Sequence, residues 1–383
     1  MSLTNKEKLQ EINFFNKKMF KKFAAERKRR IPSEEYQVSM RNCENVLEIE
    51  DLHTFFYTEI GTVRAVDGVT INIERGKTVG IVGESGCGKS VTSLSIMRLL
   101  HEPHGQIADG QIKFNSEKGA VDLVKLPPKK MDAIRGREIS MIFQEPMTTL
   151  NPVFTIGKQL DEVLKYHNTE KYSTKEITKR SLDMLNTVEI ANAKTVYRMY
   201  PHEISGGMRQ RVVIAMALIC GPKLIIADEP TTALDVTIQA QILDLMRSLK
   251  QKTSAAIMLI THDLGVIAEI ADYVVVMYAG RVVEQGEVHE IFHNPCHPYT
   301  IGLMRSRPDN TSGERLYSIP GNVPNPVNLP DHCFFRNRCE KSVKACAGKY
   351  PPFFMVSPTQ KSACYLQTGK PTEDRAAEKG PAE

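Results

Sequence analysis

The sequence predicts an α/β domain whose sheet is largely parallel and covered by helices on both faces. Apolar, strand-like segments at 223–227, 255–261 and 273–278 alternate with helical segments such as 238–251. This alternation favours parallel pairing, because each helical crossover carries the chain back over one face of the sheet. With 383 residues, the chain has room for one such domain with appendages but would be crowded by a second large one.

Composition excludes several classes of protein. The chain is 41% hydrophobic and 25% charged, which is normal for a globular protein. No segment offers the roughly 18 uninterrupted apolar residues of a membrane-spanning helix, and the N-terminus lacks the apolar core of a secretory signal. Ten Lys and Arg against three Glu in residues 1–30 hold the excess positive charge, so the remainder is near neutral. We therefore expect a soluble protein that has no nucleic acid among its partners.

The basic N-terminal extension is predicted to contain an amphipathic helix. Ile12, Phe15, Met19 and Phe23 fall on one helical face with lysines around the remainder, and Pro32 should end the helix. Contact with an anionic lipid surface or with a membrane subunit is one interpretation of such a face. An ordinary packed helix explains the pattern equally well.

A glycine-rich segment follows a predicted strand at Thr78–Val82 and precedes a helical pattern at 91–100. It consists of Gly83, Glu84, Ser85, Gly86, Cys87, Gly88, Lys89 and Ser90. This is a P-loop in its strand-loop-helix context, in which backbone N–H groups and the helix N-terminus bind phosphates. We expect Lys89 to reach the β- and γ-phosphates and the Ser90 hydroxyl to bind Mg²⁺. A glycine-rich turn without a ligand is the alternative, and the length of the match with both flanks argues against it.

Two carboxylates follow the apolar strand at 223–227. The strand should place Asp228 beside the metal and Glu229 where it can polarise a water for attack on the γ-phosphate. An Asp-Glu pair after an apolar run is also common without any function, so these residues gain meaning only together with the P-loop.

Between these two pieces, the segment 204–211 reads Ile-Ser-Gly-Gly-Met-Arg-Gln-Arg. It resembles the signature sequence of ATP-binding cassette (ABC) proteins, and the resemblance covers about residues 45–302. It implies a P-loop NTPase cassette with a RecA-like sheet core and a helical subdomain at about 145–215. The resulting domain prediction is a basic extension at 1–44, the nucleotide-binding domain at 45–302, an irregular cysteine-rich extension at 303–370 and a disordered tail at 371–383.

The family resemblance also implies roles for single residues. Gln144 matches a glutamine that contacts Mg²⁺ or the attacking water, His262 a histidine that contacts the γ-phosphate, and Phe56 an aromatic ring that stacks on adenine. Residues 231–235 match a loop that touches a partner subunit. The signature residues Ser205, Gly206, Gly207 and Met208 would face the γ-phosphate of ATP bound to that partner. The chain therefore needs a second ABC ATPase subunit, identical or related.

Four cysteines lie close together near the C-terminus: Cys333, Cys339, Cys346 and Cys364. They are separated by five, six and seventeen residues, and four thiolates in a short irregular segment suit zinc or an iron–sulfur cluster. The spacing does not choose between these metals, and four unrelated reduced cysteines remain the third interpretation.

The segment 321–364, with Pro324, Pro330, Arg338 and Pro352 around the cysteines, resembles the C-terminal extension of oligopeptide and dipeptide importer ATPases. In that subfamily the cysteines hold a 4Fe-4S cluster. The resemblance implies an ATPase that powers peptide import with two transmembrane permease subunits and an extracytoplasmic solute-binding protein, at the cytoplasmic face of the membrane. The same subfamily includes importers of nickel, glutathione and other small solutes.

Two other classes of protein compete with this interpretation. A non-transport ABC ATPase would usually carry two cassettes or a long coiled insertion, and residues 90–205 show no sustained heptads. A redox protein with a regulatory nucleotide site would need a flavin or nicotinamide site, for which the sequence supplies no motif.

Overall fold

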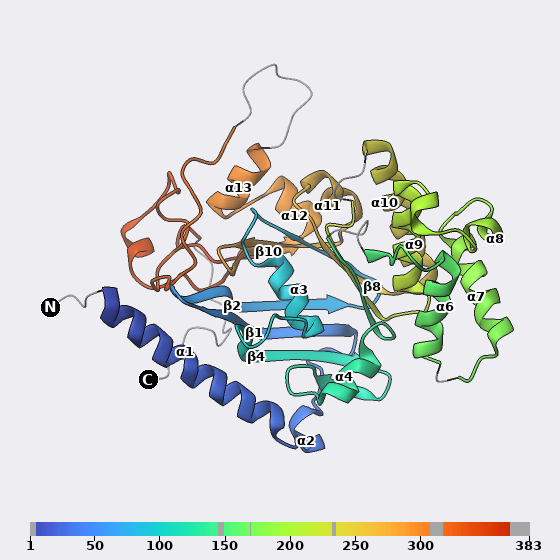
Figure 1. Ribbon diagram of the computed structural model, residues 1–383. Coiled ribbons are helices and arrows are strands. Elements are labelled where there is room, and N and C mark those ends of the chain that lie inside the picture. The colour runs from blue at the N-terminus through green and yellow to red at the C-terminus, as the bar shows by residue number, and fades with distance from the viewer. Residues whose placement is uncertain (1–4, 145–148, 169, 232–234, 307–316, 368–383) are drawn as a thin grey trace.

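The computed structural model describes residues 5–144, 149–168, 170–231, 235–306 and 317–367. Their strands form two sheets stacked with a helix between them (Figure 1). The four-stranded antiparallel sheet, in the order β2-β1-β4-β5, consists of β1 (Asn45–Thr58), β2 (Gly61–Glu74), β4 (Gly105–Ser116) and β5 (Gly119–Asp122). The eight-stranded sheet, in the order β11-β12-β10-β9-β3-β8-β7-β6, consists of β3 (Thr78–Val82), β6 (Ile139–Ile142), β7 (Leu224–Asp228), β8 (Ala256–Ile260), β9 (Tyr273–Tyr278), β10 (Arg281–Glu287), β11 (Phe354–Met355) and β12 (Lys361–Ser362).

The helices surround the two sheets, and α3 lies between them. They are α1 (Asn5–Lys28), α2 (Ser33–Tyr36), α3 (Lys89–Met97), α4 (Pro128–Ile134), α6 (Ile156–Tyr166), α7 (Thr174–Thr187), α8 (Ala193–Val196), α9 (Gly206–Leu218), α10 (Val236–Thr253), α11 (Leu264–Ile270), α12 (Val288–His293) and α13 (Pro298–Arg305). Two 3₁₀ helices are η1 (Pro201–Glu203) and η2 (Lys344–Ala347).

Five neighbouring strands of the larger sheet, β9-β3-β8-β7-β6, are parallel, as the sequence predicts. β3 pairs with β8 and β9, and β7 pairs with β6 and β8. Their residues alternate between the two faces, so that Ile225 and Ile257 pack toward the outer helices while Ile226 and Met258 pack toward the smaller sheet. Both faces are therefore buried, which explains the almost wholly apolar strand sequences.

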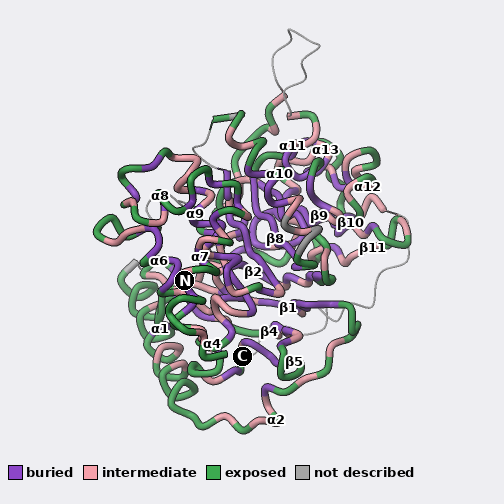
Figure 2. Tube along the Cα trace, turned by 90° about the vertical axis from the view of Figure 1, so that its right-hand side faces the viewer, coloured by how far each residue is buried: buried purple, intermediate pink, exposed green. Residues whose placement is uncertain are grey.

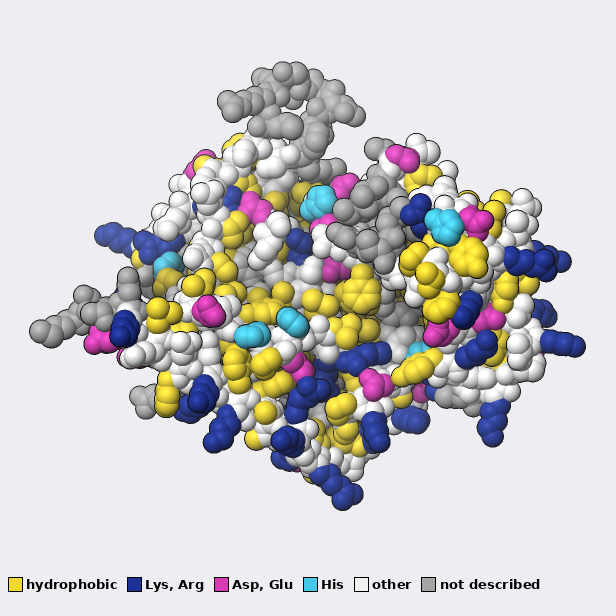
Figure 3. All heavy atoms as spheres, in the orientation of Figure 1, with side chains coloured by type: hydrophobic (Ala, Val, Ile, Leu, Met, Phe, Trp, Pro, Cys, Tyr) yellow, Lys and Arg dark blue, Asp and Glu magenta, His cyan; other side chains and the backbone are white. Residues whose placement is uncertain are grey.

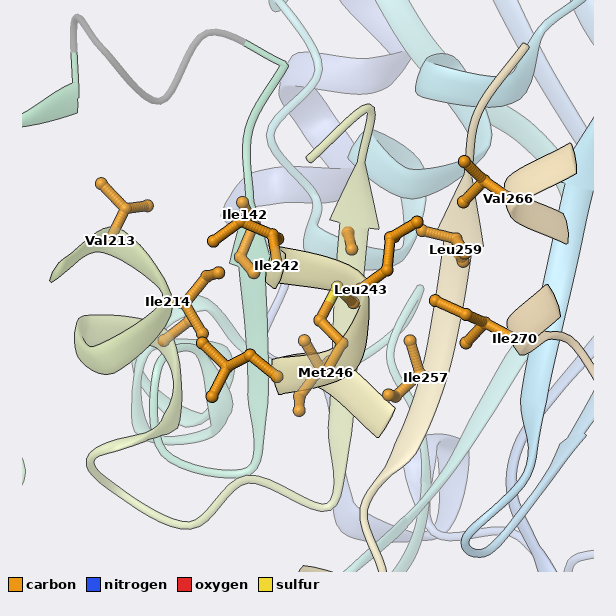
Figure 4. Packing of buried hydrophobic residues seen from close by; sticks show 14 of the residues in the cluster. Ile142, Val213, Ile214, Ile242, Leu243, Met246, Ile257, Leu259, Val266 and Ile270 are labelled. Carbon is orange, nitrogen blue, oxygen red and sulfur yellow. The ribbon is translucent and has the colours of Figure 1, made fainter. Parts of the chain in front are cut away.

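The outer face of the larger sheet is covered by α9, α10 and α11. Figure 4 shows Met246 of α10 and Ile270 of α11 on either side of Ile257 of β8, with Ile214 of α9 nearer to Ile142 of β6. The other face packs on α3 and on the antiparallel sheet, through residues such as Ile96 and Leu47. The central strands thus sit at the middle of the molecule, and Figure 2 shows them buried while α1 lies exposed on the outside.

The predicted helical subdomain at about 145–215 contains α6, α7, α8, η1 and α9, apart from residues 145–148 and 169, which lie outside the described residues. Local sequence starts its helices. The Ser173 hydroxyl accepts a hydrogen bond from the backbone N–H of Glu176, whose carboxylate accepts one from the N–H of Ser173. This reciprocal cap satisfies two N–H groups at the start of α7.

The N-terminal helix differs in one respect from the prediction. α1 ends at Lys28, four residues before Pro32, and packs on the antiparallel sheet. Its contact face is centred on Asn16, whose side chain is 8% exposed and donates a hydrogen bond of 3.0 Å to the carbonyl of Thr58. Phe15, predicted on this face, is 46% exposed and touches Tyr57 only edge-on. Ile12, Met19 and Phe23 are half-buried, so three of the four predicted face residues lie on the packed side, and a polar contact that a hydrophobic pattern does not reveal is added to them.

The outward side of α1 is strongly basic. Figure 3 shows Lys and Arg side chains along the lower edge of the molecule, where Figure 1 places this helix. Within the described residues, no helix combines the length and apolarity needed to cross a membrane.

The described C-terminal residues 317–367 contain only short elements, and they are joined to the main sheet. β12 pairs antiparallel with β10 and with β11, so the last described segment forms the edge of the eight-stranded sheet. The backbone N–H of Ala363 also donates to the carbonyl of Val283 at 2.8 Å. Residues 307–316 and the predicted tail at 371–383 lie outside the described residues.

Candidate nucleotide site

The P-loop connects the end of β3 to the start of α3, and glycines make this connection possible. Gly83 has φ of 153°, and an added Cβ would lie 2.2 Å from the carbonyl oxygen of Met277. Gly88 has φ of 102°, and its Cβ would lie 2.3 Å from the carbonyl oxygen of Ala65. Because both positions exclude any side chain, the loop passes directly against the backbone of its neighbours.

Lys89 lies inside this loop. Its Nζ donates hydrogen bonds to the carbonyl oxygens of Gly83 at 2.7 Å and Glu84 at 3.2 Å, and the residue is only 7% exposed. A full positive charge therefore sits at the N-terminus of α3, where the helix dipole adds partial positive charge. Such a cradle attracts a polyphosphate.

Two of the three predicted Mg²⁺ ligands, Ser90 and Asp228, are brought together across 138 residues of sequence. Ser90 Oγ donates to Asp228 Oδ1 at 3.1 Å, and Ser93 Oγ lies 3.4 Å from Asp228 Oδ2. Asp228 is 3% exposed, and this burial raises the pKa of its carboxyl, against the opposing effect of the Ser90 hydrogen bond. A hydroxyl beside one carboxylate suits Mg²⁺, which usually completes its shell with substrate phosphates and water.

The three predicted catalytic residues also meet. Gln144 Nε2 donates to Glu229 Oε2 at 3.2 Å, and His262 Nδ1 lies 3.4 Å from Glu229 Oε1. They follow β6, β7 and β8, whose carboxyl ends share one edge of the sheet. Glu229 adopts φ of 49°, a left-handed conformation that is unfavourable for a residue with a side chain and that often occurs at functional sites. Its side chain is 15% exposed, so the carboxylate is held yet accessible.

The signature residues lie at the start of α9. Ser205 Oγ accepts a hydrogen bond from the N–H of Met208 at 3.3 Å, which makes Ser205 the N-cap of the helix. Ser205 is exposed, and Gly206, Gly207 and Met208 are partly exposed. In Figure 1, α9 belongs to the helical group at the right of the molecule, whereas α3 lies at its centre. The P-loop and the signature residues therefore lie in different parts of the folded molecule.

Other predicted residues lie nearby with less distinctive contacts. Phe56 on β1 is half-buried and packs its ring against Gly105, where an added Cβ would be 2.7 Å away. Ser85 and Gly86 form the exposed tip of the P-loop, and burial raises the pKa of the Cys87 thiol. Of the loop expected to touch a partner, 232–234 lie outside the described residues.

Two P-loop contacts were not expected from the sequence. The guanidinium of Arg338 pairs with the carboxylate of Glu84, and the hydroxyl of Tyr299 accepts a hydrogen bond from the N–H of Glu84. These partners are separated by 254 and 215 residues, so no spacing rule reveals them. The only available signal is an arginine directly before a predicted cluster cysteine.

The four C-terminal cysteines line one small cavity, together with His297, Phe335 and Tyr365. Burial raises the pKa of the Cys333 and Cys364 thiols to about 11. Burial also raises the pKa of the Cys296 thiol, next to His297 in the sequence, to about 11. The described part of the chain contains no group of three or more His, Cys, Asp or Glu side chains arranged to hold a metal ion.

A parallel sheet, a P-loop that encloses Lys89 and an adjacent pair of carboxylates fit a P-loop nucleotide-binding domain. The ABC transporter family profile matches residues 66–232, and the profile of the oligopeptide/dipeptide transporter C-terminal region matches residues 283–346. The dimeric structure of MJ0796, a bacterial ABC transporter cassette, superposes with a TM-score of 0.56 at 26% identity, covering 63% of this chain and 98% of that one.

Curated relatives extend the likeness over most of the chain. The oligopeptide transport ATP-binding protein AppD and the dipeptide transport ATP-binding protein DppD, both of Bacillus subtilis, are each 50% identical. Their alignments cover 84% and 85% of this chain and 96% and 95% of those proteins. A putative peptide import ATP-binding protein of Brucella abortus is 52% identical over 83% of this chain and 96% of its own length. The chain belongs to the ABC transporter family, as an ATPase of the oligopeptide/dipeptide group.

Proposed function

We propose that this ATPase powers the import of oligopeptides or dipeptides through a membrane ABC transporter. The ATPase part rests on one observation: Gln144 and His262 both contact the accessible carboxylate of Glu229, which follows the buried Asp228 in the sequence. The peptide cargo is supported by the relatives, which are named for peptide, oligopeptide and dipeptide transport.

Each residue receives a role in this proposal. Lys89 binds the β- and γ-phosphates, while Ser90, Asp228 and Gln144 hold Mg²⁺. Glu229 polarises the attacking water. Contacts with Gln144 and His262 orient the Glu229 carboxylate. His262, whose side chain is 68% exposed, is free to turn toward the γ-phosphate. Phe56 stacks on the adenine.

The exposed signature supports a paired enzyme. Ser205 and the following N–H groups lie at the solvent-facing start of α9, so they are available to a γ-phosphate bound by a second cassette. Closure of two cassettes around ATP would then drive two transmembrane permease subunits at the cytoplasmic face of the membrane, with a solute-binding protein delivering the peptide. The division into an extension at 1–44, a cassette at 45–302 and a C-terminal part at 303–370 belongs to the same proposal.

Glu229→Gln tests the function. The substitution keeps the shape of the side chain but removes its basicity, so ATP hydrolysis should fall at least about 100-fold while ATP binding persists. Uptake of a labelled oligopeptide by cells carrying the variant in the intact transporter should stop. Glu162→Gln is the matched control, since Glu162 is exposed on α6 and makes the same change of charge. Hydrolysis by the Glu229→Gln variant near the wild-type rate would refute the assigned role.

We further propose that Cys333, Cys339, Cys346 and Cys364 hold a 4Fe-4S cluster. The thiols fit such a group because all four line one cavity, and a bound metal would supply the positive charge that deprotonates buried thiols.

The cluster can be tested on chain purified without oxygen. We expect visible absorption with about four iron and four sulfide per chain, and loss of both in a Cys346→Ser variant. Cys43→Ser is the control, since Cys43 is an exposed thiol in another part of the fold. One zinc per chain with no iron would contradict the proposal.

A further inference from the structure

The P-loop carboxylate Glu84 is held by the C-terminal extension. Arg338 Nη1 donates to Glu84 Oε2 at 2.7 Å, and Nη2 donates to Glu84 Oε1 at 3.0 Å. The Arg338 side chain is 6% exposed and that of Glu84 is 26% exposed. A two-point, charge-assisted pair with little solvent is both stronger and more directional than an exposed ion pair.

Arg338 is itself fixed in place. Its Nε donates to the carbonyl of Pro320 at 3.0 Å, and Nη1 also reaches the hydroxyl of Tyr278 at 3.3 Å. The guanidinium carbon lies 5.7 and 5.8 Å from the ring centres of Tyr278 and Phe335. Because neighbours fix the guanidinium, it presents its paired N–H groups to Glu84 in one orientation.

The backbone of Glu84 is held as well. Its N–H donates to the hydroxyl of Tyr299 at 2.8 Å, and Tyr299 on α13 is completely buried. Its carbonyl accepts a hydrogen bond from Lys89 Nζ at 3.2 Å. A displacement of Glu84 would therefore move a direct partner of the lysine that is assigned to the phosphates.

We infer that Arg338 is a positioning residue for the P-loop, through which the C-terminal extension sets the nucleotide affinity of the cassette. The glycines allow the P-loop to adopt its conformation but do not fix it there. The two hydrogen bonds from Arg338 to Glu84 would then hold the P-loop in the conformation that binds phosphates. The inference rests on the proposed nucleotide-binding role of the loop.

The first test measures the loop without nucleotide. Cys87 is 1% exposed within the P-loop, so its rate of alkylation reports opening of the loop. In the full chain, Arg338→Met should raise this rate about tenfold, as expected when a charge-assisted hydrogen bond is lost. Cys220, at the end of the α9 segment, serves as the reference for general loosening. Arg336→Met is the matched control in the same segment, and it should leave both rates unchanged.

The second test measures MgATP affinity in a double-mutant cycle. Arg338→Met and Glu84→Gln should each weaken binding about tenfold, and the double variant should be no worse than either alone. Arg338→Lys keeps the charge but not the paired N–H groups, so its affinity should fall between wild type and Arg338→Met. The Lys variant also serves if the Met variant fails to fold.

Several outcomes would overturn the inference. Equal increases in alkylation at Cys87 and Cys220 would show general destabilisation instead of a local effect on the loop. Independent, additive losses of affinity would show that Arg338 does not act through Glu84. Failure of the wild-type chain to bind MgATP would contradict the proposed function. The alkylation experiment would still test the role of Arg338 in that case, because it requires no nucleotide.

Discussion

The P-loop and the signature turn are both placed at the start of a helix, but they are supported very differently. The P-loop is held by contacts from four distant parts of the chain, at Ala65, Met277, Tyr299 and Arg338. The described hydrogen bonds of the Ser205 side chain are local to its own helix, and the residue is exposed. The difference shows that this chain supports its P-loop from inside the fold and exposes the Ser205 turn, which is the arrangement that the proposed two-subunit site requires.

The largest effect is expected at the internally built half. Lys89→Met removes the charge at the centre of the loop and should weaken MgATP binding about 100-fold or more. Fluorescence titration with a labelled ATP analogue measures this loss. Lys77→Met is the matched control, since Lys77 is exposed at the other end of β3. If Lys89→Met and Lys77→Met bound MgATP with equal affinity, the buried Lys89 would not contact phosphate. The contrast between the P-loop and the signature turn would then be lost.

A mixing experiment tests the outward-facing half, at which substitution should have a much smaller effect on ATP binding. Ser205→Arg should abolish hydrolysis by the paired chain but keep ATP binding, since each P-loop stays intact. Mixed with the Lys89→Met chain, it forms pairs in which an intact P-loop meets an intact signature. If copies of the chain pair randomly with one another, ATPase activity should return to about a quarter of the wild-type rate.

Formation of the mixed pair is checked by two affinity tags on the two chains. Mixed pairs that form and remain inactive would contradict a site completed by the neighbour. Activity of Ser205→Arg alone near the wild-type rate would show that the signature is not needed, and the distinction between the two halves would disappear.

Sequence patterns predicted the parts of the fold that local chemistry determines. The strand Thr78–Val82 and the P-loop after it have the expected bounds, because a fully buried strand and a glycine-rich turn leave few alternatives. The edge at which Gln144, Glu229 and His262 meet also follows from parallel strands. The family resemblance supplied their roles, which periodicity does not contain.

The missed features depend on contacts between distant segments. β4 and β5 were not predicted, because β4 is interrupted by Gly110 at φ of 96° and its regular alternation of half-buried and buried residues is confined to 111–116. The buried Asn16 contact and the Arg338–Glu84 pair join residues 42 and 254 positions apart. No local pattern encodes such pairs, because each partner looks like an ordinary polar surface residue until the chain is folded.

The short strand β12 gives the C-terminal extension a protective role. It occupies the hydrogen-bonding side of β10, and only the two residues of β11 lie beyond it. A chain shortened before Lys361 would leave the buried strand β10 with unpaired backbone N–H and C=O groups on that side. An unpaired strand edge can form hydrogen bonds with strands of other molecules. Truncation would therefore remove β12, the strand that prevents β10 from pairing with neighbouring copies.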